Sequence, residues 1–248
     1  MRDLKIQEKL KLLQELYDSA EWLRKKIFFC RKGCSTCCTQ SVTMSALEGE
    51  LIYRHLESKA ALQKFAALLA GSDHKPLRPE MTTNHFVRSF MASPEEIPVA
   101  GDGWSFEPCP FLENGSCRIY AVRPFACRAF VSLDDCRLAG TASVPPVLVT
   151  LNTLMQQIIE HLSIGGCWGN MLDVLARRLL PTQVAGQEGL RREAVLLDSE
   201  TIPAFLVAEK ERPVVQKYLD GIGQVLQRFA TGEIQQEVKA LQKCLSRI

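Results

Sequence analysis

The sequence predicts a mainly α-helical fold, in which helices surround an irregular cysteine-rich core with one small β-hairpin and a helical C-terminal region follows. Three observations support this fold class. Apolar residues recur at helical spacing over long stretches at both ends of the chain. Proline and glycine, which favour turns, punctuate the middle. Eight of the ten cysteines lie between positions 30 and 136.

The N-terminal part reads as helices separated by a break. Residues 3–29 carry an amphipathic pattern that predicts one long helix, with Gly33 expected to break it. Ser45 and Glu48 have the spacing of a capping box, which predicts a second helical stretch. That stretch should end at a C-cap glycine, Gly71, and it is long enough for one or two helices.

The middle of the chain reads as loop and hairpin. Residues 72–107 should form a loop with short extended pieces, because prolines and glycines interrupt them. The dipeptide Asn114-Gly115 is a strong hairpin-turn signal. Cys109 and Cys117 lie on the two sides of this turn, so the hairpin should present their sulfurs together.

The C-terminal part carries four apolar stripes at helical spacing, over residues 148–162, 171–179, 214–229 and 234–241. We expect a flexible connection around residues 185–193, which are rich in Gly, Glu and Arg. Two domains follow from this pattern. Residues 1–140 would form a cysteine-cluster domain with an N-terminal helix, and residues 141–248 a helical region of unassigned role.

Charge and hydropathy exclude several classes of partner. The formal net charge is +2, from 30 basic and 28 acidic side chains, so nothing favours nucleic acid or an anionic membrane surface. No apolar run reaches the roughly 18 residues that a transmembrane helix needs. The N-terminus mixes charged with apolar residues, unlike a signal peptide. We therefore expect a cytoplasmic, reducing location.

Four cysteines fall within nine positions: Cys30, Cys34, Cys37 and Cys38. They could be small apolar side chains in a core, but Leu or Ala would pack there without a risk of oxidation. Disulfides fit poorly, because a bridge between neighbouring residues is strained and the compartment is reducing. Thiolates are soft ligands that select zinc, copper(I) and iron–sulfur iron, and a cation offsets their mutual repulsion. Metal ligation is the favoured interpretation.

The expected metal ligands are eight: Cys30, Cys34, Cys37, Cys38, Cys109, Cys117, Cys127 and Cys136. They could form two tetrahedral four-cysteine sites, or one cluster with accessory thiols. The cofactor would be zinc or an iron–sulfur cluster. Cys167 and Cys244 are expected to be buried free thiols, and His85 is the one histidine considered as a substitute ligand.

Arg123 and Arg128 are the expected cofactor-binding residues. Four thiolates on one Zn²⁺ leave a net negative charge, and buried charge is costly unless it is paired. Four more basic residues lie close to the cysteines in sequence: Arg31, Lys32, Arg118 and Arg137. Four aromatic residues should pack around the metal and exclude water: Trp104, Phe106, Phe111 and Phe125.

The pattern C30-x3-C34-x2-C37-C38 is followed by C109-P-F-L-x2-G-x-C117-x-I-Y-x2-R-P-x2-C127-R-x-F. Together these motifs resemble the CxxxCxxCC (YkgJ-like) cysteine-cluster family over residues 28–137. The resemblance implies zinc or iron chelation and implies no reaction, so no catalytic residue is assigned.

The first motif, C30-x3-C34-x2-C37, also has the spacing found in radical S-adenosylmethionine enzymes. A predicted helix precedes it here, Thr36 precedes the third cysteine, and alternating strand–helix units are missing, so this interpretation is disfavoured. Two hypotheses remain open. The first is a cytoplasmic metal-binding protein, with a metal ion and a protein as its partners. The alternative is an iron–sulfur redox or group-transfer enzyme.

Overall fold

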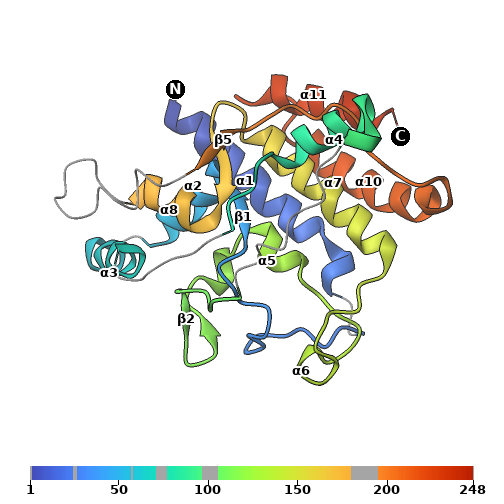
Figure 1. Cartoon of the computed structure of the whole chain (residues 1–248). Coiled ribbons are helices and arrows are strands. Elements are labelled where there is room, and N and C mark those ends of the chain that lie inside the picture. Colours follow the sequence, from blue (N-terminus) through green and yellow to red (C-terminus); the bar gives the residue numbers. More distant parts are fainter. Residues whose placement is uncertain are drawn as a thin grey trace.

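The computed structural model describes residues 2–24, 27–56, 58–70, 77–96, 106–179 and 195–247. The described chain is mainly α-helical with a few short strands, as predicted (Figure 1). The predictions for Gly71, Trp104 and the connection at 185–193 fall outside the described residues.

Four helices from the two ends of the chain pack together. Helix α1 contacts α10, and α7 contacts both α10 and α11 (Figure 1). Leu12 and Leu16 of α1 and Leu226 of α10 are completely buried in this bundle. Burial of such apolar stripes is the main favourable contribution to folding. The helices are α1 (Arg2–Ser19), α7 (Pro146–Leu162), α10 (Arg212–Gln227) and α11 (Gln235–Leu245).

A second group of elements is joined to α1 through α2 (Ala46–His55), which also contacts α8 (Met171–Leu179). The group also contains α3 (Lys59–Ala70). Beside them lies a three-stranded antiparallel sheet of order β1-β4-β5, which was not predicted. Its strands are β1 (Thr43–Ser45), β4 (Cys167–Asn170) and β5 (Leu196–Asp198). Strands this short leave too little alternation to be recognised in a sequence.

Several predictions of helices are confirmed. The stretch opened by Ser45 contains two helices, and its capping box is formed in full by the Ser45 and Glu48 side chains. All four C-terminal stripes form helices. The first helix is shorter than predicted, because α1 ends at Ser19 and a 3₁₀ turn, η1 (Glu21–Arg24), follows. The Ser19 hydroxyl donates to the Leu16 carbonyl at 2.7 Å, a bond that competes with helix continuation.

The prediction that residues 72–107 form only a loop is wrong in part. Helix α4 (Thr83–Ala92) and a 3₁₀ turn, η2 (Pro94–Glu96), lie within this segment. Thr82 caps α4 by accepting a hydrogen bond from the His85 amide.

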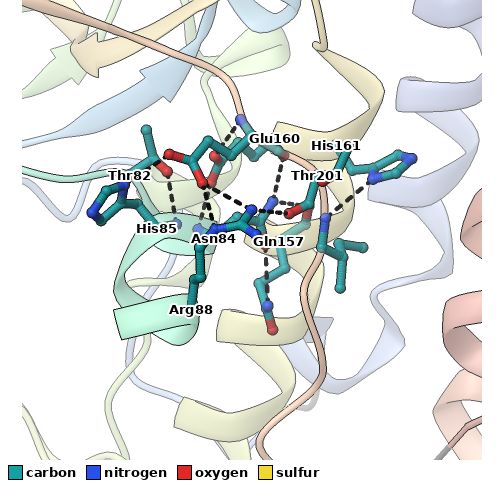
Figure 2. Close-up of polar contacts among 10 residues, drawn as sticks. Thr82, Asn84, His85, Arg88, Gln157, Glu160, His161 and Thr201 are labelled. Carbon is teal, nitrogen blue, oxygen red and sulfur yellow. Dashed lines mark hydrogen bonds and ion pairs between the residues drawn. The ribbon is translucent and has the colours of Figure 1, made fainter. Parts of the chain in front are cut away.

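A buried polar network holds α4 against α7 (Figure 2). The Glu160 carboxylate accepts hydrogen bonds from the backbone amides of Asn84 at 2.9 Å and Glu200 at 2.8 Å. The Asn84 side chain donates to the Gln157 carbonyl at 3.1 Å and the Glu200 carbonyl at 2.9 Å. Burial raises the pKa of Glu160. Sequence periodicity missed α4 because these partners are more than 70 residues away in the chain.

The buried apolar residues form one hydrophobic cluster. Residues on both sides of position 140 contribute to it, for example Leu16 and Ile52 together with Ile158 and Leu226. The division into two domains at this position stays a prediction.

Candidate metal centre

The elements that carry the expected ligands lie together at one end of the molecule, at the bottom of Figure 1. They are the irregular segment after η1 and a small hairpin, followed by two short helices. The hairpin strands are β2 (Leu112–Glu113) and β3 (Ser116–Cys117), and the helices are α5 (Phe125–Ala129) and α6 (Cys136–Ala139). Cysteines separated by about a hundred positions therefore share one region.

Seven of the eight expected ligands line one cavity of about 310 Å³, which we call the main cavity. They are Cys30, Cys34, Cys37, Cys38, Cys109, Cys117 and Cys127. The eighth, Cys136, lines a second cavity of about 310 Å³, which we call the side cavity. Cys30 and Cys34 line both cavities, so the two adjoin.

The hairpin has the geometry that its turn dipeptide predicts. Asn114 (φ 51°) and Gly115 (φ 74°) are both left-handed, as the two-residue turn of a tight hairpin requires. Leu112 pairs with Cys117 across the strands. The Leu112 amide donates to the Cys109 carbonyl at 3.0 Å, so the turn holds both cysteines in place.

A backbone hydrogen bond joins the hairpin to the first cysteine cluster. The Cys109 amide donates to the Cys38 carbonyl at 2.9 Å. The next pairing, between Thr39 and Pro108, is an antiparallel bridge. The two halves of the cysteine motif therefore meet through main-chain contacts that need no metal.

Helix α5 presents Cys127, and the Glu48 carboxylate fixes the start of that helix. Glu48 accepts hydrogen bonds from the Phe125 amide and from the Tyr17 hydroxyl, each at 2.7 Å. Its other oxygen accepts from the Ser45 amide at 2.8 Å. One buried acid thus joins α1, α2 and α5.

Arg123 and Arg128 both line the main cavity. The Arg123 guanidinium lies 3.7 Å from the centre of the Tyr120 ring and donates to the Tyr120 carbonyl. The Arg128 guanidinium donates to the carbonyls of Arg123 and Ala121 and lies over the Tyr17 ring. Arg123 donates to one backbone carbonyl and lies within electrostatic range of three cysteines, whereas Arg128 donates to two backbone carbonyls.

Residues 29–143 match the CxxCxxCC family. The description of this family is "Putative zinc- or iron-chelating domain". The match contains all eight expected ligand cysteines and confirms the resemblance that the motifs indicate. No match to the chain was found among curated proteins or among solved structures.

The donor set of the CxxCxxCC segment fits zinc or iron, because it consists of soft thiols gathered around two adjoining cavities. The sulfurs do not form a finished coordination shell. Within the described residues, no three or more Cys, His, Asp or Glu side chains lie close enough together to hold a metal ion. Cys34 and Cys37 are exposed. Ligation would therefore draw the irregular segment that carries them inward.

The environment of the thiols raises most of their pKa values. Burial raises the pKa of Cys109 to about 11, and it also raises the pKa of Cys127 and of Cys30. The Cys37 thiol donates a hydrogen bond to the Cys38 sulfur, which raises the pKa of Cys37 and lowers that of Cys38. Protonated thiols avoid the repulsion that several buried thiolates would create, and metal binding would displace these protons.

Some of the other predicted contributors do not lie as expected. Arg118 pairs with Glu113 across the hairpin and lines neither cavity, whereas Arg137 pairs with Asp135 and lines the side cavity. Phe106 is 83% exposed and therefore cannot exclude water. His85 lies on α4, where its Nδ1 is 2.7 Å from a Glu200 carboxylate oxygen, and it lines neither cavity.

Phe111 and Phe125 are buried, as predicted, but they pack against other aromatic rings and not around the cavities. Phe111 stacks on Phe65 with ring centres 5.0 Å apart, and Phe125 stacks on Tyr17 at 6.2 Å. Neither ring lines the main cavity or the side cavity. They support the segments that carry the cysteines.

Three contributors were missed by sequence reasoning. Tyr17 and Met171 line the main cavity, and Glu48 fixes the Cys127 helix. Tyr17 and Met171 look like ordinary members of apolar helical stripes. Glu48 was recognised as a helix cap, and its second role depends on a contact 77 residues away.

No described helix has the length and apolar character that crossing a membrane requires.

Proposed function

We propose that this protein binds zinc or an iron–sulfur cluster through cysteine thiolates, with all eight clustered cysteines as ligands. One observation carries the proposal. Seven of these cysteines come from three separate segments of the chain and line one cavity, which adjoins the cavity that holds the eighth. Apolar packing alone gives no reason for so many thiols to converge there.

The charge of the site supports an anionic thiolate–metal group. The Arg123 guanidinium lies within electrostatic range of Cys37, Cys117 and Cys127. A fixed positive charge offsets the negative charge that four thiolates leave on a zinc ion or a four-iron cluster. Arg123 and Arg128 are the residues we propose beside the metal.

A second function, as an iron–sulfur redox or group-transfer enzyme, has one observation in its favour. Cys34 and Cys37 are exposed, and the cavity beside them is large enough for a small molecule. A structural zinc site is closed by its ligands, whereas a working site keeps an open edge. Bound zinc would rule out this second function, because zinc has no redox chemistry.

We also propose a location and partners for this protein. All ten cysteines are unpaired, which suits a reducing compartment such as the cytoplasm. We propose a metal ion as the ligand and a protein as the partner that delivers or receives it. The balanced charge gives no reason to propose nucleic acid or a membrane surface.

Anaerobic purification with metal analysis tests the proposal. A brown protein that contains iron and acid-labile sulfide would hold an iron–sulfur cluster, and a colourless protein with bound zinc would hold Zn²⁺. Cys127→Ser should release metal, since a hydroxyl oxygen is a poorer ligand for these ions. Cys244→Ser is the matched control, because Cys244 lies on α11 and lines neither cavity. A parent protein that holds neither zinc nor iron would contradict the proposal.

A further inference from the structure

We infer that the eight cysteines form two four-sulfur metal centres rather than one. The inner centre comprises Cys38, Cys109, Cys117 and Cys127, and the outer centre comprises Cys30, Cys34, Cys37 and Cys136. This inference rests on the proposed function and adds which cysteines share a metal.

Backbone contacts around the main cavity join three of the inner four, and the fourth, Cys127, lines the same cavity. The Cys109 amide donates to the Cys38 carbonyl at 2.9 Å, and Leu112, which donates to the Cys109 carbonyl, pairs with Cys117. Cys127 lies within electrostatic range of Cys109 and Cys117. Cys109, Cys117 and Cys127 also pack against the hydrophobic core, as Cys30 alone of the outer set does.

Three of the outer four line the side cavity, and the fourth, Cys37, lines only the main cavity. The three are Cys30, Cys34 and Cys136, and Cys136 does not line the main cavity. The Phe29 amide donates to the Ser132 carbonyl at 3.0 Å, which brings the segment before Cys30 beside the segment that leads to Cys136. Cys30 lies within electrostatic range of Cys34, Cys37 and Cys136, the other three members of this set.

The adjacent pair Cys37-Cys38 is where the two centres meet. The Cys38 amide donates to the Ser35 carbonyl and the Thr39 amide donates to the Cys37 carbonyl, so the chain turns sharply at the pair. Cys38 is half-buried and tied to the hairpin, whereas Cys37 is exposed. Two neighbouring cysteines can therefore supply one sulfur to each centre, which accounts for a CC dipeptide better than a single metal does.

The two centres differ in accessibility. Every inner cysteine is partly buried, but the outer set contains both of the exposed ligands, Cys34 and Cys37. Three basic side chains line the side cavity together with the acidic Asp134 and Asp135, whereas three arginines and no acidic residue line the main cavity. The outer centre should therefore lose its metal to a chelator first, and the inner centre should hold its metal longer.

The first test is metal release from the intact protein, loaded anaerobically with the metal that it retains on purification. Under a competing chelator, we expect two phases of equal amplitude, each releasing half of the metal. Iodoacetamide added after the fast phase should alkylate the four outer cysteines and spare the four inner ones, as mapped by mass spectrometry. Release in a single phase, or alkylation that mixes the two sets, would overturn the division.

Substitutions provide the second test. Cys34→Ser should remove the fast phase and leave half of the metal, whereas Cys117→Ser should remove the slow phase. The double variant should lose all metal, while Cys34→Ser with Cys136→Ser should lose no more than either alone. Cys167→Ser is the control, since Cys167 lies on β4 and lines neither cavity. If each single variant lost all of its metal, the eight cysteines would share one centre. The parent protein would still bind metal, so the proposed function would stand. A different result, in which the parent protein itself holds no metal, would contradict the proposed function.

Discussion

The Glu48 carboxylate connects helix α5 of the candidate metal centre to helices α1 and α2 by hydrogen bonds. It is buried and accepts hydrogen bonds from the Tyr17 hydroxyl, from the Phe125 amide and from the amide and hydroxyl of Ser45. A carboxylate offers enough lone pairs for all four donors. Helix α5 carries Cys127, so the position of this sulfur depends on an acid that is not itself a ligand.

Glu48→Gln should therefore weaken both the fold and metal retention. In glutamine, an NH₂ group replaces one of the two accepting oxygens and would point at a group that is itself a donor. Leaving a buried donor unsatisfied costs about 1–3 kcal/mol. Metal loss to a chelator should become roughly 10-fold faster, as expected for a residue that orients a ligand. Glu209→Gln is the control, because Glu209 is exposed in η4 (Glu209–Glu211). A variant that melts and retains metal like the parent would contradict this role.

Arg123 is the residue that we expect to balance the charge of the thiolates. Arg123→Ala should speed metal loss and lower the thermal midpoint, because a charge-assisted contact contributes about 1.5–3 kcal/mol. Arg123→Lys should be intermediate, since lysine keeps the charge and loses the planar fork. The control is Arg212→Ala, at the exposed start of α10, which lines neither cavity. If Arg123→Ala and Arg212→Ala behave alike, Arg123 contributes no electrostatic stabilisation.

At the scale of elements, the hairpin depends on the backbone conformation of Gly115. Gly115→Ala forces a side chain into a left-handed conformation, at a cost of about 1 kcal/mol. An added Cβ would meet nothing within 4 Å, so any effect comes from the backbone alone. We expect faster loss of metal, because β3 carries Cys117.

Gly221→Ala is the matched control for that substitution. Gly221 lies inside α10 and its Cβ would also meet nothing within 4 Å. Alanine in a helix interior should raise the free energy of unfolding by roughly 0.5–1 kcal/mol and leave metal retention unchanged. Thermal melts and chelator competition on both variants measure the contrast. Equal metal retention in the two variants would show that the turn does not position a ligand.

At the scale of the whole molecule, the cysteine region should depend on metal for its order more than the helical bundle does. Besides irregular chain, residues 27–42 and 106–137 contain two short strands, the 3₁₀ turn η3 (Tyr120–Val122), helix α5 and the start of α6, and their sulfurs line the cavities. Where ligation organises a segment, binding free energy becomes folding free energy. The bundle of α1, α7, α10 and α11 instead buries its own apolar stripes.

Removal of metal should therefore leave most of the helical circular dichroism signal intact. Amide exchange and limited proteolysis should show loss of protection in residues 27–42 and 106–137, with protection kept in α7 and α10. Restoring metal should restore protection. Equal protection of this region with and without metal would show that its backbone contacts and buried aromatic residues suffice.

The sequence alone determined the parts of this protein whose signal is local. Apolar spacing predicted the C-terminal helices, Ser45 and Glu48 predicted a capping box, and Asn114-Gly115 predicted the hairpin turn, because each depends on residues a few positions apart. The density and spacing of cysteines identified the CxxCxxCC segment for the same reason.

Only the tertiary structure decided how these pieces meet. Helix α4 forms against Glu160, the sheet pairs β1 with β4 across more than a hundred residues, and Cys136 lies in a cavity apart from Cys127. The chain pattern alone allowed one centre or two and did not divide the eight expected ligands into sets. These outcomes depend on which distant groups can bury apolar area and satisfy hydrogen bonds together, and no short stretch of sequence contains that information.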